Sequence, residues 1–146
     1  MTAKEYLQQI YIISKKVKRL QQLAEQLRSE AYSVNSPMGS MSQDKVQTSF
    51  TGDKMDRMIV RMDNTDRHIR REQKRLKEQS LKIQQQIEAV GDERYRSILF
   101  ARYVLCKTWE KVAEDVPCDV RHVYRLHGDA LKAFEDMYAD EIKSCH

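Results

Sequence analysis

The side chains best suited to a chemical task lie near the C-terminal end of the sequence. Arg121, His122 and Arg125 follow shortly after Asp119. An arginine guanidinium can donate two parallel hydrogen bonds to the edge of a guanine, and a histidine can add a single contact. Arg121 and Arg125 are spaced by one helical turn, so a helix would present both on the same face. Their types and spacing suit a surface that contacts base edges in the major groove of DNA.

Two short segments with helical periodicity must position these residues. Pro117 separates the segments, because a proline stops a helix. Thr108 is placed to cap the first helix, over residues 109–116, and Asp119 is placed to cap the second, which begins at Val120. The predicted inward faces are Trp109, Val112, Ala113 and Val116 in the first helix and Val123, Leu126, Ala130, Leu131 and Phe134 in the second.

The cationic residues of the second helix are predicted to lie on its outer face. The small Ala113 lets the two helices approach closely. A short helix, a tight turn and a second helix with exposed arginines are together the pattern of a DNA-binding helix-turn-helix. A plain helical hairpin would need the same packed core and stays an alternative. The candidate DNA contacts at this end of the chain are Asp119, Arg121, His122 and Arg125.

Two long helices are expected in the N-terminal part. Residues 3–31 contain neither glycine nor proline, and their apolar residues recur at alternating steps of three and four, which predicts a helix with a coiled-coil-like stripe. Residues 33–54 are rich in Ser, Gly and Asn and predict a flexible loop. A second helix is predicted over residues 56–90, where the apolar residues at every seventh position are Met55, Met62, Ile69, Leu76, Ile83 and Val90.

The companion positions of this second helix are less regular. Asp66, Gln73 and Ser80 are polar, so the middle of the helix is expected to pack loosely or against polar partners. The two long helices can fold back as an antiparallel hairpin or pair between chains. The seam predicted to hold them together consists of Ile10, Val17, Leu20, Met62, Ile69, Leu76 and Ile83.

Cations also gather within the second long helix. Between residues 67 and 77, Glu72 is the only acid among Arg67, His68, Arg70, Arg71, Lys74, Arg75 and Lys77. Such a run is either a solvated helix face or a stripe that follows the phosphates of a nucleic acid. Arg71 and Lys74 are the candidate phosphate contacts.

The helix-turn-helix segment resembles a known family. TWEKVAEDV followed by VRHVYRLHGDALKAF is similar to region 4 of the sigma-70 family of RNA polymerase subunits, and the preceding ERYRSILFARYVL is similar to the helices that lead into that module. The order of long basic helices before this module resembles the small region-4-like regulators carried by phages and prophages of Gram-positive bacteria. This resemblance implies regulation of late genes together with host RNA polymerase, and it carries a DNA-reading role to Arg121, His122 and Arg125.

Other classes of function have little support in the sequence. No nucleophile and base share a recognisable motif, so no enzyme activity and no cofactor are expected. Cys106, Cys118 and Cys145 include no CxxC pair and fit a reduced compartment rather than a disulfide or zinc site. The longest apolar stretch is short and is interrupted by Arg102, so a cytoplasmic protein of a bacterial host cell, with no membrane partner, is expected.

These observations predict an all-α protein with two domains. Residues 1–90 form a helical hairpin with a loop at 33–54, and residues 91–146 form a helix-turn-helix domain of the sigma region 4 type. The expected function is sequence-specific transcription regulation, with double-stranded DNA as the partner, host RNA polymerase as a second partner, and homodimerisation through the N-terminal helices. The alternatives are a DNA-packaging subunit resembling a phage small terminase and an adaptor of RNA polymerase that does not bind DNA.

Overall fold

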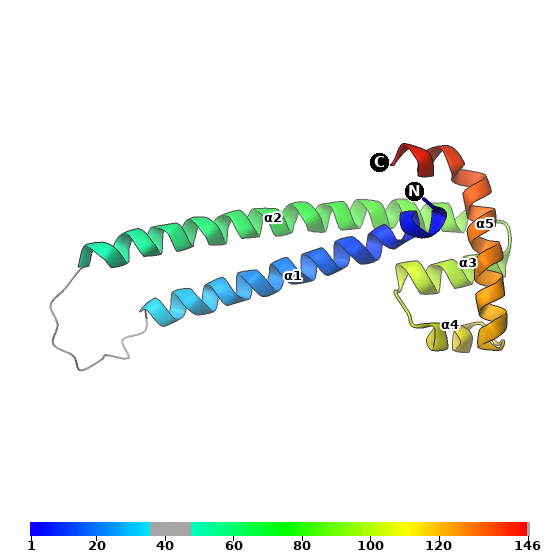
Figure 1. The fold of residues 1–146 in the computed structure, drawn as a ribbon, viewed down its shortest axis with the longest axis horizontal. Coiled ribbons are helices and arrows are strands. Elements are labelled where there is room, and N and C mark those ends of the chain that lie inside the picture. Colours follow the sequence, from blue (N-terminus) through cyan, green and yellow to red (C-terminus); the bar gives the residue numbers. More distant parts are fainter. Residues whose placement is uncertain (36–47, 146) are drawn as a thin grey trace. The chain divides into compact units, whose positions relative to one another are not determined.

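Every regular element in the described part of the chain is helical. The computed structural model describes residues 1–35 and 48–145. In chain order its elements are α1 (Ala3–Asn35), α2 (Thr48–Glu88), α3 (Glu93–Leu99), the π-helical segment η1 (Phe100–Val104), α4 (Trp109–Asp115) and α5 (Val120–Ser144), as Figure 1 shows. The predicted all-α class is confirmed.

The two long helices extend further than the sequence indicated. α1 continues to Asn35 and α2 begins at Thr48, so the loop predicted over residues 33–54 is too long at both ends. The glycine content of this segment suggested a loop, but Gly52 lies inside α2 with open space around it. One glycine costs a helix only about 1 kcal/mol relative to alanine, so the helix continues through it. The rest of the predicted loop, residues 36–47, and its predicted flexibility lie outside the described residues.

The chain divides into two compact units. One consists of Met1–Ser14 together with Arg75–His146, and the other of Lys15–Lys74. The first unit has a core that draws on both ends of the chain. Its buried residues are Ala3, Tyr6, Leu7 and Ile10 of α1, Ile83 and Ile87 of α2, Val90, Leu99 and Tyr103 after α2, and Ala130, Phe134 and Ile142 of α5.

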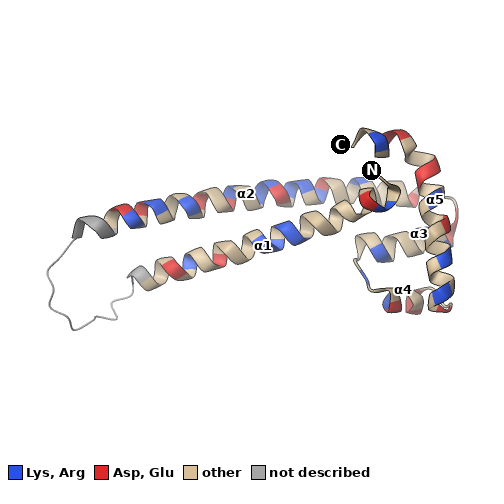
Figure 2. Ribbon diagram, in the orientation of Figure 1, with Lys and Arg blue, Asp and Glu red and all other residues tan. Residues whose placement is uncertain are grey.

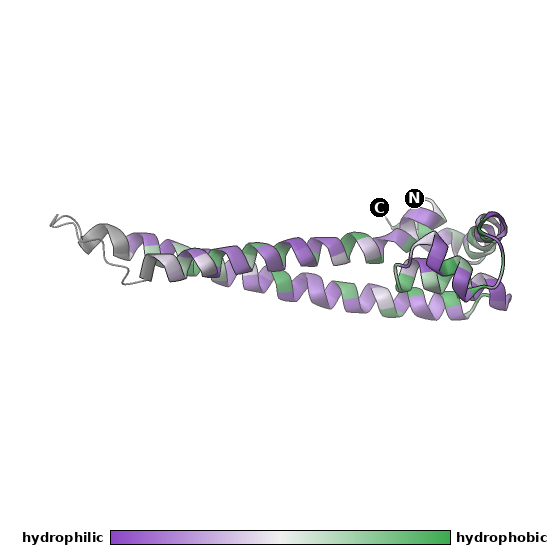
Figure 3. Ribbon diagram, turned by 90° about the horizontal axis from the view of Figure 1, so that it is seen from below, coloured by the Kyte–Doolittle hydropathy of each residue, from purple (hydrophilic) through white to green (hydrophobic). Residues whose placement is uncertain are grey.

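The second unit is less well buried. α1 buries Val17, Ala24 and Leu27 there, whereas Met62 and Ile69 of α2 are only half-buried. Figure 3 shows that hydrophilic residues predominate along both long helices. Of the predicted seam, Ile10, Val17 and Ile83 are therefore buried, and Leu20, Met62, Ile69 and Leu76 are half-buried.

The polar positions of α2 that meet α1 agree only in part with the predicted ones. Asp66, which belongs to the predicted row, pairs with Arg28 of α1 at 3.5 Å in the second unit. In the second unit, Lys16 Nζ lies 2.7 Å from Glu72 Oε1. In the first unit, Gln79 donates to Gln9 over 2.7 Å and Gln86 accepts from the Tyr6 hydroxyl over 3.0 Å. These three contacts fall at 72, 79 and 86, whereas the predicted row continues from Asp66 to 73 and 80, one residue later, and Gln73 is exposed. A 3.6-residue helix places both the third and the fourth residue after an apolar position near the partner, so sequence spacing alone did not settle this choice.

The helical segment that leads into α4 ends at Val104. Asp92 caps α3, because its carboxylate accepts a hydrogen bond from the Arg94 backbone N–H over 2.8 Å. After α3 the helix widens into the π-helical turn of η1 and stops at Val104. Cys106 then reverses the chain with a left-handed φ of 52°, a conformation that few residues other than glycine adopt.

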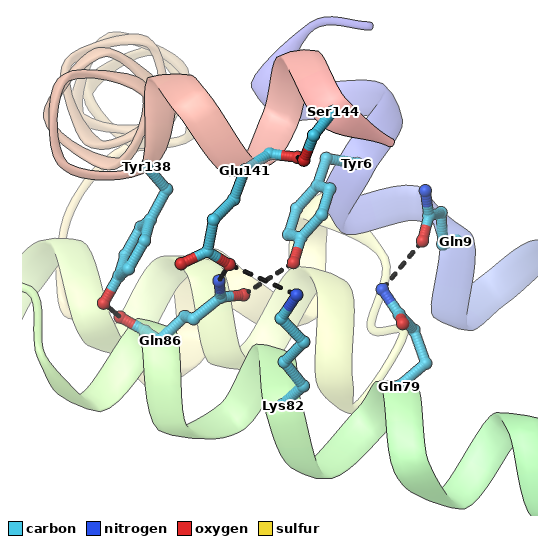
Figure 4. Close-up of polar contacts among 8 residues, drawn as sticks. All are labelled: Tyr6, Gln9, Gln79, Lys82, Gln86, Tyr138, Glu141 and Ser144. Carbon is cyan, nitrogen blue, oxygen red and sulfur yellow. Dashed lines mark hydrogen bonds and ion pairs between the residues drawn. The ribbon is translucent and has the colours of Figure 1, made fainter. Parts of the chain in front are cut away.

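A kink in α5 lets its last turns join the first unit's core. The backbone of Tyr138 leaves helical geometry, with φ −123° and ψ 26°, and Ile142 beyond it is buried. Figure 4 shows the polar contacts that hold this end. Glu141 accepts from Gln86 over 2.7 Å and pairs with Lys82 at 3.2 Å, and the Tyr138 hydroxyl donates to the Gln86 carbonyl over 3.3 Å.

Candidate nucleic-acid interface

The outer surface of α5 depends on a small core beneath it. Val112 of α4 and Val123 of α5 are fully buried against Ile98 and Ala101 of the preceding helices. Trp109, Ala113 and Val116 pack at the edge of this cluster, as the sequence predicted for the inward face of α4. The predicted inward residues of α5 are also confirmed, since Leu126, Ala130 and Phe134 are buried and Leu131 is half-buried.

The three predicted base-contacting residues lie on the other side of α5. Arg121 and Arg125 are exposed, and His122 is half-buried between them along the helix. The Arg125 guanidinium lies 3.2 Å from His122 Nδ1, so a hydrogen bond joins these two side chains. Because Val123 and Leu126 fix the helix from below, this surface presents two guanidinium groups and an imidazole on a supported backbone.

The capping prediction holds for the position of Asp119 but not for its side chain. Asp119 occupies the N-cap of α5 with extended backbone angles, and its carbonyl accepts from the Val123 N–H over 3.0 Å. No cap hydrogen bond joins its carboxylate to the first turn, and the same is true of the Thr108 hydroxyl at α4. The exposed Asp119 carboxylate therefore does not cap α5, and it precedes the cationic residues Arg121 and Arg125 in the chain.

An aromatic cluster joins Trp109 of α4 to Tyr124 and His127 of α5. Trp109 lies 4.7 Å from the His127 ring and 4.9 Å from the Tyr124 ring, measured between centroids. The Arg102 guanidinium covers Trp109 at 4.6 Å, and the Tyr103 hydroxyl lies 2.8 Å from His127 Nε2. Burial, together with repulsion from Lys4 and Arg102, lowers the pKa of His127 to about 4, and burial raises the pKa of Tyr103 to about 12. Both side chains are thus uncharged at neutral pH, and His127 joins α5 to η1 through Tyr103 and to α4 through Trp109.

The predicted phosphate contacts belong to the other compact unit. Arg71 and Lys74 are exposed on α2 within Lys15–Lys74. Figure 2 shows the concentration of basic residues along the middle of this helix. Arg67 pairs with Asp63 at 3.0 Å, and Glu72 is buried against Lys16. The exposed surface at this level of α2 is therefore dominated by cations.

Comparison with known proteins identifies the family of the chain. Within the part of the chain that the structure describes, no helix is long and apolar enough to cross a membrane, and no group of three or more His, Cys, Asp or Glu residues could hold a metal ion. No curated protein and no solved structure matches the chain. Residues 33–135, more than half of the chain, match a family that is described as "Protein of unknown function (DUF1492)", and the chain belongs to this family.

Proposed function

We propose that this protein is a sequence-specific DNA-binding transcription regulator. In this proposal α4, the turn and α5 act as a helix-turn-helix of the sigma region 4 type, and α5 enters the major groove. The regulator is encoded by a phage or prophage and acts on late genes with host RNA polymerase. The N-terminal part of the protein, which α1 and α2 form, is an antiparallel, coiled-coil-like hairpin. This hairpin pairs with a second copy of the chain or contacts the polymerase.

One observation carries the proposal. Arg121 and Arg125 are exposed on a helix whose opposite side is anchored by the buried Val123 and Leu126. Guanidinium groups are the side chains best suited to guanine edges, and a rigid support reduces the entropy lost when they bind. Within the described residues, neither arginine forms an ion pair with an acidic side chain, so both donors can turn to a ligand.

The test is a titration with DNA. Wild type, Arg121→Ala and Arg125→Ala are titrated with a duplex selected from random sequence by the wild-type protein and with a scrambled duplex. Loss of either arginine should weaken binding to the selected duplex by about 1 to 3 kcal/mol and relax the preference at one base pair. Lys143→Ala is the matched control, because it removes one exposed cation from the last turn of α5, beyond the kink at Tyr138.

The phosphate contacts should behave differently from the base contacts. Arg71→Ala and Lys74→Ala should weaken both duplexes alike and reduce the salt dependence by about one ion each. Circular dichroism checks that every variant is folded. If both recognition-helix variants bind the selected duplex as tightly as wild type, α5 is a structural helix, and the role of an adaptor that does not read DNA takes precedence.

A further inference from the structure

The basic run of α2 lines a groove that the sequence does not reveal. A hollow of about 500 Å³ is lined by Asn64, Arg67, Arg70 and Arg71. Three of its four lining side chains are guanidinium groups, and the fourth carries an amide. Guanidinium groups offer only hydrogen-bond donors, and the amide can turn its own donors toward the hollow. The chemistry of this lining therefore suits an anion with several acceptor oxygens.

The one acid of this run does not neutralise the groove. Glu72 is 8% exposed and its carboxylate is 2.7 Å from Lys16 of α1. His68 Nε2 lies 3.7 Å from the same oxygen, Oε1. Because the Lys16 ammonium offsets the negative charge of Glu72 at this distance, the ion pair leaves the positive field of the exposed arginines largely in place.

The arginines also repel one another. Arg67 and Arg71 are separated by one helical turn, and so are Arg67 and Arg70, and like charges at these spacings destabilise a helix by about 0.2 to 0.5 kcal/mol per pair. Asp63 pairs with Arg67 at 3.0 Å. In the described part of the chain, Arg70 and Arg71 have no such carboxylate partner, so a bound anion would relieve repulsion that the protein itself leaves in place.

We propose that Asn64, Arg67, Arg70 and Arg71 form a binding site for the phosphate backbone of duplex DNA, independent of the base-reading surface of α5. This proposal rests on the proposed function, because that function supplies duplex DNA as the partner. The groove lies on the surface of a helix, and the four residues span about 10 Å at 1.5 Å per residue. That length matches about three phosphates of one strand, which are spaced 3.4 Å apart along the duplex axis.

The experiment compares two triple variants of the full chain. Arg67→Gln, Arg70→Gln and Arg71→Gln are combined in one, and Lys54→Gln, Arg57→Gln and Arg61→Gln in the other. Both variants remove three cations from exposed positions of α2, but the second set lies earlier in the helix, among Asp53, Asp56 and Asp63. Fluorescence anisotropy with a labelled scrambled duplex at four salt concentrations gives the dissociation constant and its salt slope.

The groove variant should lose about two to three units of the slope of log K against log salt, and its affinity at 50 mM salt should fall at least tenfold, because each phosphate contact contributes about 0.9 units. The control triple should stay within threefold of wild type. Equal losses of DNA affinity and salt slope in both triple variants would show that only the net charge of the protein determines binding, and would overturn the proposed site. So would an unchanged slope in the groove variant, or tighter binding of an RNA duplex of equal length than of DNA.

The same measurements separate this site from the proposed function. If the groove variant loses its salt slope but the wild type shows no preference between selected and scrambled duplexes, the backbone site stands and sequence-specific regulation fails. If the preference depends on Arg121 and Arg125 while the groove variant binds like wild type, sequence-specific regulation stands, whereas the groove fails together with the phosphate contact of Arg71.

Discussion

At the scale of single residues, burial of His127 connects the stability of the α4 and α5 packing to pH. His127 is 8% exposed and is wedged between Trp109 and Tyr103. Its pKa is lowered from 6.5 to about 4, first by burial and then by repulsion from Lys4 and Arg102. Between these two values the unfolded chain binds a proton that the folded protein does not. The contribution of His127 to stability is therefore complete above about pH 6.5 and is lost as the pH falls toward 4.

This linkage gives a prediction for acidic conditions. Lowering the pH from 7 to 5 should reduce the free energy of unfolding through His127 by at most about 1.4 kcal/mol per pH unit. His127→Gln should be less stable at pH 7 but should show a weaker pH dependence between 5 and 7. Urea denaturation at both pH values measures the difference, and His122→Gln, a half-buried histidine on the same helix, is the control. Identical pH dependence in wild type and His127→Gln would contradict the assignment.

The sequence was informative about some residues and silent about others. The exposure of Arg121 and Arg125 followed from helical periodicity, because Val123 and Leu126 fixed which side of α5 faces inward. The Tyr103 and His127 pair could not be found in this way. The two residues lie on different elements, and their contact depends on the π-helical turn of η1. The periodicity of the sequence does not predict such a turn.

At the scale of elements, α2 shows how burial alternates along one helix. Ile83 is fully buried, whereas Leu81, two residues earlier, is 55% exposed. Truncation of a buried isoleucine to alanine removes contacts and leaves a cavity, so Ile83→Ala should lower the free energy of unfolding by about 2 to 5 kcal/mol. Leu81→Ala should change it by less than about 0.5 kcal/mol. Thermal and urea denaturation of the two variants check the assignment, and similar losses in both would mean that α2 is rotated about its axis.

The seven-residue repeat of α2 predicted a helix and its main apolar row, but of the polar positions named beside that row only Asp66 pairs with α1. Ile87 is buried. The side chains of α2 that bond to α1 are Gln79 and Gln86 in the first unit and Asp66 and Glu72 in the second. Buried polar residues in a helix pair favour one register over others, since each misaligned pairing leaves an unsatisfied group. Two positions on adjacent sides of a helix cannot be distinguished by hydropathy when both are polar.

At the scale of the whole molecule, the start of the chain belongs to the same compact unit as its C-terminal helices. The sequence divided the chain near residue 90, and that division stays a prediction. The buried cluster of the first unit nevertheless includes Tyr6 of α1 together with Phe134 of α5, whose ring centroids are 6.1 Å apart. Contacts between residues so distant in sequence leave no local pattern, so they could not be predicted from periodicity.

This shared core predicts that a change at the start of α1 reaches α5. Tyr6 is fully buried, and its hydroxyl bonds to Gln86 of α2. Tyr6→Ala should cost about 3 to 5 kcal/mol, by analogy with other large aromatic truncations. Hydrogen exchange should then accelerate both at the end of α2 and around Phe134 in α5, because amides of one cooperative unit lose protection together. Tyr11→Ala, at a residue that is 48% exposed on the same helix, should leave both regions protected. If Tyr6→Ala accelerates exchange in α2 but leaves the amides around Phe134 as protected as in wild type, the prediction is wrong. The C-terminal helices are then stable without the contacts that Tyr6 of α1 makes.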